Sequence, residues 1–175
     1  FGIYFRENKT THSRLEIGKG RKSQPFLNFK TKEEADSQLE KIINDFRLCQ
    51  NANNGELSKG ECFGHSINTC NGICVGDESK HEYNVRIKEI VNKTEYPSSN
   101  FLIVSQGREG IEKSFIFIKD SKFVGYGYYE FHHQIKSIDR IEKILTQAEE
   151  LADVKSLIRN YLFKANENQI INIEN

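Results

Sequence analysis

Apolar and polar residues alternate over residues 1–6 and again over residues 13–18, and the polar stretch NKTTH separates the two segments. A period of two places successive side chains on opposite faces of a strand, so the pattern predicts a β-hairpin. The stretch PFLNF, residues 25–29, predicts a short third strand. The chain therefore begins with a small antiparallel sheet.

The segment after the hairpin changes to a helical period. Thr31 is followed three residues later by Glu34, the arrangement of a capping box at a helix N-terminus. Apolar side chains then recur at helical spacing from Ala35 to Phe46. This pattern predicts a helix that ends near residue 47 and packs on the hairpin. Ser79 and Glu82 form a second capping box, which predicts another helix with an apolar face of Tyr83, Ile87, Ile90 and Val91.

The second half of the chain follows the polar linker EYPSSN, residues 95–100. Three apolar segments come next, separated by the turn sequences QGREG and KDSK: FLIVS, SFIFI and FVGYGYY. They predict a three-stranded antiparallel meander. Helical segments are expected from about residue 138. We expect Thr146 and Glu149 to cap the last helix, whose predicted buried stripe is Ala148, Leu151, Ala152, Ile158, Tyr161 and Leu162.

These elements predict an α+β fold with two subdomains. The first, residues 1–95, holds the N-terminal β-hairpin with its helix, then the cysteine-rich loop and helix; the second, residues 96–175, holds the antiparallel meander and the C-terminal helices. The first residue is Phe rather than Met, so we expect a fragment of a longer protein. The chain has no apolar run near twenty residues and no signal-peptide pattern, which predicts a cytoplasmic protein without membrane contact.

Charge is unevenly distributed along the chain, although the formal net charge is zero. Residues 1–32 carry a net charge of +6 and the remainder carries −6. A basic N-terminal region predicts a surface for DNA phosphates, with Arg14, Lys19, Arg21 and Lys22 on the second strand and its exit, and Arg108 at the tip of the QGREG turn. The alternative is a solvated basic hairpin, since a neutral protein is a poor nonspecific binder of nucleic acid.

All four cysteines fall within 26 residues, at the spacing C-x12-C-x7-C-x3-C: Cys49, Cys62, Cys70 and Cys74. In a cytosolic protein such clustering favours a metal site over disulfides. Zinc knuckles supply two close cysteine pairs, and here only one pair is close, so an iron–sulfur cluster suits the spacing at least as well as zinc. His65 is a substitute ligand in the same segment. Free cysteines and oxidised pairs remain the alternatives.

The opening of the chain resembles the first hairpin of GIY-YIG nucleases. Gly2-Ile3-Tyr4 is followed by Glu16-Ile17-Gly18 at the spacing of that family's two triplets. The resemblance implies a catalytic Tyr on the hairpin and an Arg on the next helix. Glu16 replaces the second Tyr, and residues 32–46 contain no Arg. We therefore expect a hairpin without a nuclease site; the alternative is a stand-alone endonuclease that uses Tyr4 and Arg21.

Residues 47–90 resemble the cysteine-rich segment of the UvrC excision-repair nucleases. Its pattern is matched in order by Cys62, Ile67, Cys70, Cys74, Val75, Gly76, Glu82 and Tyr83. Glu61 stands where that family has Pro before a cysteine, which is a departure. UvrC-type segments are associated with an iron–sulfur cluster, so the resemblance favours iron over zinc.

The flanking segments extend the resemblance over nearly the whole chain. They include FKTKEEADSQLEKIINDFRLC before the cysteines and NFLIVSQGREGIEKSFIFIKDSKFVGYGYY after them. Together they are similar to the C-terminal region of bacterial DNA polymerase III epsilon subunit-like exonucleases, in which a 3′–5′ exonuclease domain and a GIY-YIG domain come first. The resemblance implies a non-catalytic accessory region of a DNA-processing exonuclease, with DNA, the upstream domains and polymerase or repair proteins as partners. A pure protein-interaction module is the further alternative.

Overall fold

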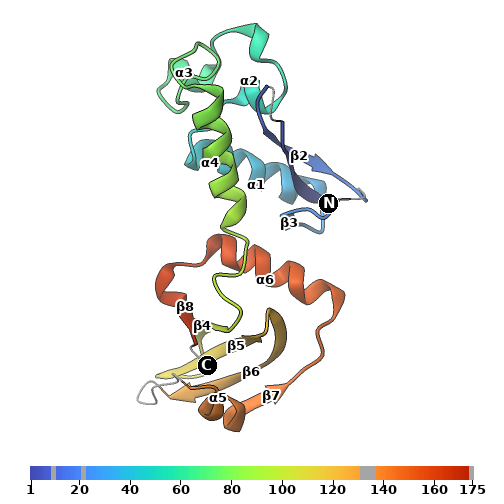
Figure 1. Cartoon of the computed structure of the whole chain (residues 1–175), viewed down its shortest axis with the longest axis vertical. Coiled ribbons are helices and arrows are strands. Elements are labelled where there is room, and N and C mark those ends of the chain that lie inside the picture. Colours follow the sequence, from blue (N-terminus) through green and yellow to red (C-terminus); the bar gives the residue numbers. More distant parts are fainter. Residues whose placement is uncertain (9–10, 21–22, 131–136, 174–175) are drawn as a thin grey trace. The chain divides into compact units, whose positions relative to one another are not determined.

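The computed structural model describes residues 1–8, 11–20, 23–130 and 137–173. The chain divides into two compact units, unit 1 (Phe1–Thr94) and unit 2 (Glu95–Asn175). Each unit combines helices with an antiparallel sheet (Figure 1). The predicted α+β class is therefore confirmed. No helix in the described ranges has the length and apolar character needed to cross a membrane.

Unit 1 begins with a three-stranded antiparallel sheet in the order β2-β1-β3. Its strands are β1 Gly2–Arg6, β2 Arg14–Gly18 and β3 Leu27–Asn28. The predicted hairpin is confirmed, and its register sets Tyr4 opposite Glu16. The third strand is shorter than the pattern predicts.

Two long helices follow in unit 1, α1 (Lys32–Asp45) and α4 (Lys80–Asn92). Both predicted capping boxes are confirmed: the hydroxyl oxygens of Thr31 and Ser79 each accept a hydrogen bond from the backbone N–H of a Glu at N3, and that Glu accepts one in return. The segment between the helices contains only short elements: α2 Gln50–Asn53, the 3-10 helix η1 Leu57–Lys59 and α3 Phe63–Ser66.

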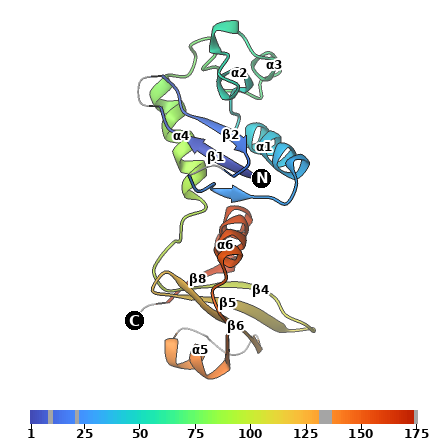
Figure 2. The ribbon, with the colours of Figure 1, turned by 90° about the vertical axis from the view of Figure 1, so that its right-hand side faces the viewer.

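The core of unit 1 is formed by apolar side chains of the sheet and the two long helices, which lie beside the sheet (Figure 2). It includes Ile3, Leu15, Leu27, Ala35, Ile42, Ile87 and Ile90. Polar contacts tie the cysteine segment to the hairpin. The Leu15 backbone N–H donates to Asn53 Oδ1 at 2.9 Å, and His12 Nε2 lies 2.9 Å from the Ala52 carbonyl oxygen. The helix α2 is thereby fixed against β2.

Unit 2 is built on a five-stranded antiparallel sheet in the order β7-β6-β5-β4-β8. The predicted meander is confirmed as β4 Phe101–Gln106, β5 Glu112–Lys119 and β6 Lys122–Glu130. Two short strands extend its edges, β7 Leu145–Gln147 and β8 Ile170–Asn172, and β8 follows the 3-10 helix η2 Glu167–Gln169. The hydrophobic pattern did not predict either edge strand.

Helices α5 (Ile138–Ile144) and α6 (Ala152–Lys164) cover opposite faces of this sheet (Figure 2). Ile141 of α5 packs in a cluster with Leu102, Phe115 and Phe117. Alternate strand positions face α6, where Phe101, Ile103 and Ile118 pack with Ile158 and Leu162. The period of two along β4 and β5 thus supplies one apolar layer to each helix.

The predicted cap of the last helix is wrong. Thr146 lies in β7, opposite Tyr126 of β6, and α6 begins only at Ala152, with Leu151 as its N-cap. Leu151 is 64% exposed, so it is not part of the buried stripe. The physical reason is the close approach of two backbones: a Cβ at Gly125 would lie 2.2 Å from the Thr146 carbonyl oxygen. Glycine in β6 therefore allows β7 to pair where the local pattern indicates a helix start.

Candidate metal centre

The four cysteines converge in unit 1. Their Sγ atoms all lie within 4.8 Å of one another. Cys49, Cys62 and Cys70 are buried and Cys74 is partly exposed, and all four are free of disulfides. The predicted convergence is therefore confirmed, and the group can offer four sulfur ligands to one centre.

Backbone turns position the sulfurs. Cys49 is the N-cap of α2, and its Sγ accepts a hydrogen bond from the Ala52 N–H at 3.4 Å. The Cys70 Sγ accepts one from the Gly72 N–H at 3.3 Å. Such donors stabilise a thiolate more than a neutral thiol, because the thiolate carries the negative charge. The local backbone therefore favours the form of cysteine that binds metal.

Burial has the opposite effect on these thiols. It raises the pKa of Cys70 to about 11, and it also raises the pKa of Cys49. Without a cation these two groups hold their protons at neutral pH. A metal ion must displace the protons to bind, so its affinity for this site should rise with pH.

Two glycines make room for the converging backbone. Gly72 has φ +89°, and a Cβ there would lie 2.7 Å from Asp77 Cβ. A Cβ at Gly64 would lie 3.4 Å from Cys70 Cβ and 3.8 Å from Cys62 Sγ. Gly72 thus provides a turn that other residues adopt with strain, and Gly64 allows α3 to approach the sulfurs.

His65, the predicted substitute ligand, lies outside the sulfur group. Its Nδ1 is 2.8 Å from Glu61 Oε1 and its Nε2 is 3.0 Å from Asp77 Oδ2. An imidazolium donates from both nitrogens, so the two carboxylates raise the pKa of His65. Glu61, the departure from the UvrC pattern, forms half of this arrangement. The resulting clamp joins the start of α3 to the turn after Cys74.

Helix α4 directly follows the cysteine segment, and Arg86 ties the helix to the end of that segment. Arg86 donates to Glu78 Oε1 from Nη2 at 2.7 Å and from Nε at 3.0 Å, and its Nη1 donates to the Phe46 carbonyl oxygen. Tyr83 is fully buried, and its hydroxyl is an orphaned polar atom. The donor set, four sulfurs with backbone N–H groups and a further buried donor, fits a metal centre.

The spacing of the sulfurs bears on the kind of metal. A Zn–S bond of about 2.3 Å places four tetrahedral thiolates about 3.8 Å apart. Sulfurs within 4.8 Å of one another are close to that arrangement. A cluster distributes the same thiolates over different irons and therefore requires them to stand further apart.

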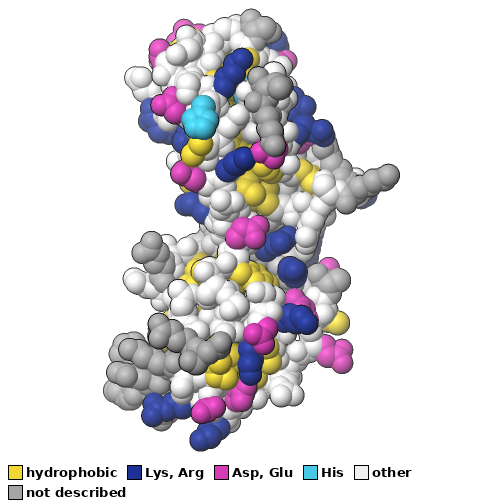
Figure 3. All heavy atoms as spheres, viewed as in Figure 1, with side chains coloured by type: hydrophobic (Ala, Val, Ile, Leu, Met, Phe, Trp, Pro, Cys, Tyr) yellow, Lys and Arg dark blue, Asp and Glu magenta, His cyan; other side chains and the backbone are white. Residues whose placement is uncertain are grey.

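The predicted DNA contacts do not form one group. Arg14 Nε lies 2.6 Å from Glu16 Oε1, and Lys19 Nζ lies 5.5 Å from the centre of the Phe1 ring. Arg108 belongs to unit 2, where it forms an ion pair with Glu112. Arg21 and Lys22 lie outside the described residues. On the face shown in Figure 3, basic and acidic side chains are interspersed in both units.

The residues at the GIY-YIG-like positions are buried or hydrogen-bonded within the hairpin. Tyr4 is only 7% exposed. Glu16 Oε1 accepts hydrogen bonds from Arg6 Nε at 2.9 Å and from Arg14 Nε at 2.6 Å. A phenol at this depth is out of reach of a DNA strand, and the residue at the second triplet neutralises its basic neighbours.

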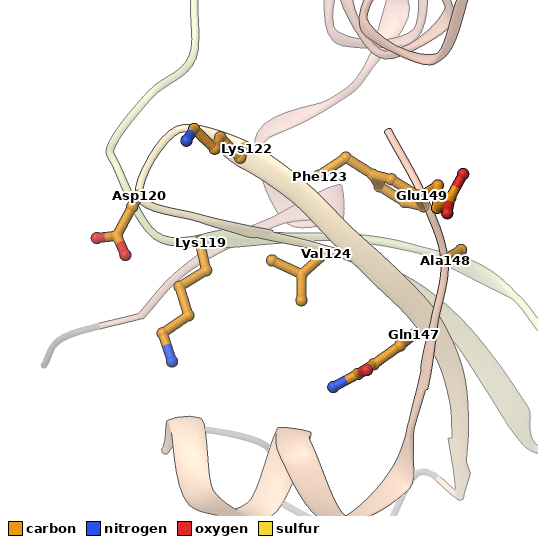
Figure 4. Close-up of a pocket in the computed structure, with 8 residues that line it drawn as sticks. All are labelled: Lys119, Asp120, Lys122, Phe123, Val124, Gln147, Ala148 and Glu149. Atoms are coloured by element: carbon orange, nitrogen blue, oxygen red, sulfur yellow. The ribbon is translucent and has the colours of Figure 1, made fainter. Parts of the chain in front are cut away.

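A shallow hollow in unit 2 lies between the β5–β6 turn and β7 (Figure 4). Its charged side chains do not converge on one point, as the same view shows: Lys119, Asp120, Lys122 and Glu149. Lys119 instead donates to Glu142 at 2.8 Å. The hollow therefore lacks the arrangement of a catalytic site.

Comparison with known families gives one match. Residues 3–93 match the family described as the UvrC/Cho excinuclease, middle domain. The match spans 91 of the 175 residues and includes the hairpin, α1, all four cysteines and α4. Neither the curated proteins nor the solved structures include a match. The chain belongs to the UvrC/Cho excinuclease middle-domain family.

Proposed function

We propose that this chain is a non-catalytic, metal-bearing accessory region of a DNA-repair nuclease. The observation that carries the proposal is the convergence of four cysteine sulfurs within 4.8 Å, in a segment that lies inside the UvrC/Cho middle-domain match. The resemblance to DNA polymerase III epsilon subunit-like exonucleases supports a parent protein whose catalytic domains precede this region. Its role is to bind DNA and to position those domains.

The centre has two candidate occupants. The UvrC-type pattern of the segment favours an iron–sulfur cluster, for which Cys49, Cys62, Cys70 and Cys74 are the ligands. The close spacing of the sulfurs favours a single zinc ion, held by the same residues. Either metal would supply cross-links between the turns of a segment that has few apolar contacts.

The experiment is an anaerobic preparation of the full chain with iron, sulfide and zinc analysis and a visible spectrum. We expect one centre per chain, lost when Cys70 is changed to Ser and kept in the control Ser66→Ala, an exposed position in the same segment. Iron with sulfide and a broad visible absorption identifies a cluster, and zinc without colour identifies a single ion. Folded protein that binds neither metal overturns the proposal.

DNA contact is assigned to the basic region of residues 1–32. Lys and Arg neutralise backbone phosphates without reading sequence, and the released counterions make such binding sensitive to salt. Arg14 already pairs with Glu16, so Lys19, Arg21 and Lys22 are the better candidates for phosphate contacts. We expect weak, sequence-independent binding.

The test is the salt dependence of DNA affinity. Each lost phosphate contact lowers the slope of log K against log salt by about 1, so Lys19, Arg21 and Lys22 changed together to Ala should flatten it by up to about 3. The matched control changes Lys122, Lys143 and Lys155 to Ala, three exposed lysines of unit 2 with the same total charge. Equal slopes for the two triple variants contradict the assignment.

Protein docking is a second candidate role, favoured by exposed apolar side chains in the cysteine segment. Phe63 is 70% exposed, Ile67 50% and Val75 43%. Phe63 and Ile67 are one helical turn apart, joined by a hydrogen bond from the Ile67 N–H to the Phe63 carbonyl oxygen. If this surface docks the upstream catalytic domains, Phe63→Ser should weaken their binding in titration calorimetry while the metal content stays unchanged. An unchanged affinity refutes docking through this surface.

A further inference from the structure

Tyr83 carries a buried hydroxyl group without a hydrogen-bond partner. The residue is fully buried, and no described group accepts from or donates to its hydroxyl oxygen. Buried polar groups in folded proteins nearly always have partners, because an unmade hydrogen bond costs the whole desolvation of the group. The Tyr83 hydroxyl is therefore available to an acceptor outside the polypeptide, such as an ordered water or a bound group, and its surroundings must decide between them.

The surroundings of Tyr83 identify the kind of acceptor. Tyr83 is the fourth residue of α4, directly after the cysteine segment. Burial raises the pKa of Tyr83, and the nearby thiols of Cys49 and Cys70 contribute in the same direction. The Arg86 guanidinium approaches the ring, at 5.4 Å from its centre, rather than the hydroxyl oxygen. Cys49 and Cys70 therefore lie near enough to act on the phenol through their charge, although no sulfur of the described residues is within hydrogen-bonding distance of the hydroxyl in this structure.

We propose that the Tyr83 hydroxyl donates a hydrogen bond to a sulfur of the metal centre, and that this bond forms only when the centre is loaded. The inference rests on the proposed function of the four cysteines. A neutral thiol is a weak acceptor, whereas a metal-bound sulfur carries negative charge and accepts strongly. Tyr83 is therefore a positioning residue, which acts on the centre through its ligands.

Tyr83→Phe should have different effects on the metal-free protein and on the metal-loaded protein. In the metal-free state the hydroxyl contributes nothing, so Tyr83→Phe should leave the thermal midpoint unchanged or raise it. In the loaded state the variant lacks a donor to the ligand sulfurs. Loss of such an outer-shell partner typically lowers metal affinity by about 10- to 100-fold.

The experiment uses Co²⁺ as the probe with the full chain, because its bands report thiolate coordination directly. Affinity is measured from the sulfur-to-cobalt charge-transfer band in competition with a chelator, and thermal midpoints are measured with and without Co²⁺. We expect Tyr83→Phe to bind Co²⁺ at least tenfold more weakly, with a shifted charge-transfer band, and to keep or exceed the metal-free midpoint of the wild type.

Tyr96→Phe is the matched control. The Tyr96 hydroxyl is also buried without a partner among the described groups, but the residue belongs to unit 2 and not to the cysteine segment. This variant should leave Co²⁺ affinity unchanged. If the wild type binds no Co²⁺ and also holds neither iron nor zinc in the anaerobic preparation, the proposed function fails. If the wild type binds Co²⁺ and Tyr83→Phe binds equally well, only the role of Tyr83 is overturned. A lower metal-free midpoint specific to Tyr83→Phe also overturns it.

Discussion

Arg86→Met removes a cation that holds three parts of unit 1 together. The guanidinium donates to the Glu78 carboxylate at the end of the cysteine segment and to the Phe46 carbonyl oxygen at the end of α1. The side chains of Arg86 and Glu78 are 20% and 8% exposed. Met keeps most of the apolar stem, so the substitution mainly removes charge and hydrogen bonds.

The expected loss of stability follows from this burial. Removing one partner of a buried ion pair costs about 3–5 kcal/mol, because the remaining charge stays buried without compensation. The Phe46 carbonyl oxygen loses a donor, which adds about 1 kcal/mol. Water reaches the exposed fifth of the Arg86 side chain and reduces the first effect. We expect about 3 kcal/mol in total.

The assay is urea unfolding followed by the amide NMR signals of α4, with the free energy of unfolding extrapolated to water at constant m. Arg6→Met is the control, since Arg6 also pairs with a carboxylate, Glu16, but is 56% exposed. An exposed pair contributes less than about 1 kcal/mol. The double variant Glu78→Gln with Arg86→Met should recover part of the loss. Equal losses for Arg86→Met and Arg6→Met would refute the reasoning.

The remaining predictions concern one turn and one titration. Gly72→Ala should lower Co²⁺ affinity at least tenfold, which corresponds to about 1.4 kcal/mol, because the turn has φ +89° and the new Cβ would meet Asp77; an unchanged affinity would show that the turn is not needed. The Arg108 guanidinium lowers the pKa of Glu112 to about 2, so this pair stabilises unit 2 above the ordinary carboxyl pKa and less as pH falls toward 2. In a carboxyl NMR titration, Arg108→Gln should raise the Glu112 pKa part of the way toward its ordinary 4.5, because the backbone N–H of residue 108 still donates to the carboxylate, and a value that stays near 2 would contradict the role of the guanidinium.

Local signals in the sequence predicted the long elements well. The capping boxes that begin α1 and α4 need only residues three apart, so the sequence contains all the information that sets these helix starts. The edge strands β7 and β8 are three residues long and depend on partners far away in sequence. No local period identifies such strands, although Gly125 was a sign that another backbone approaches β6 closely.

The candidate site was likewise predicted from the sequence only in part. The clustered spacing predicted that the four sulfurs meet, since short loops restrict where they can lie. The apolar periodicity of α4 placed Tyr83 on the buried face, but only the structure shows that its hydroxyl has no partner. Arg14 counted as a free cation in the sequence, whereas it pairs with Glu16, two residues further along β2, and the β1–β2 register sets Arg6 opposite Arg14 so that Arg6 reaches the same carboxylate. Side-chain pairing across strands depends on register, which composition does not reveal.

The cysteine segment, which contacts the hairpin through α2, buries few large apolar side chains. Among the described residues 48–79, the large apolar side chains that are buried are Leu48 and Ile73. So small a core cannot offset the entropy of ordering the segment, and metal binding then supplies free energy of folding. Loss of the metal should release α2 first, because Cys49 is its N-cap. Asn53 of α2 accepts the hydrogen bond from β2, so we expect a loss of metal to reach the basic hairpin through this contact.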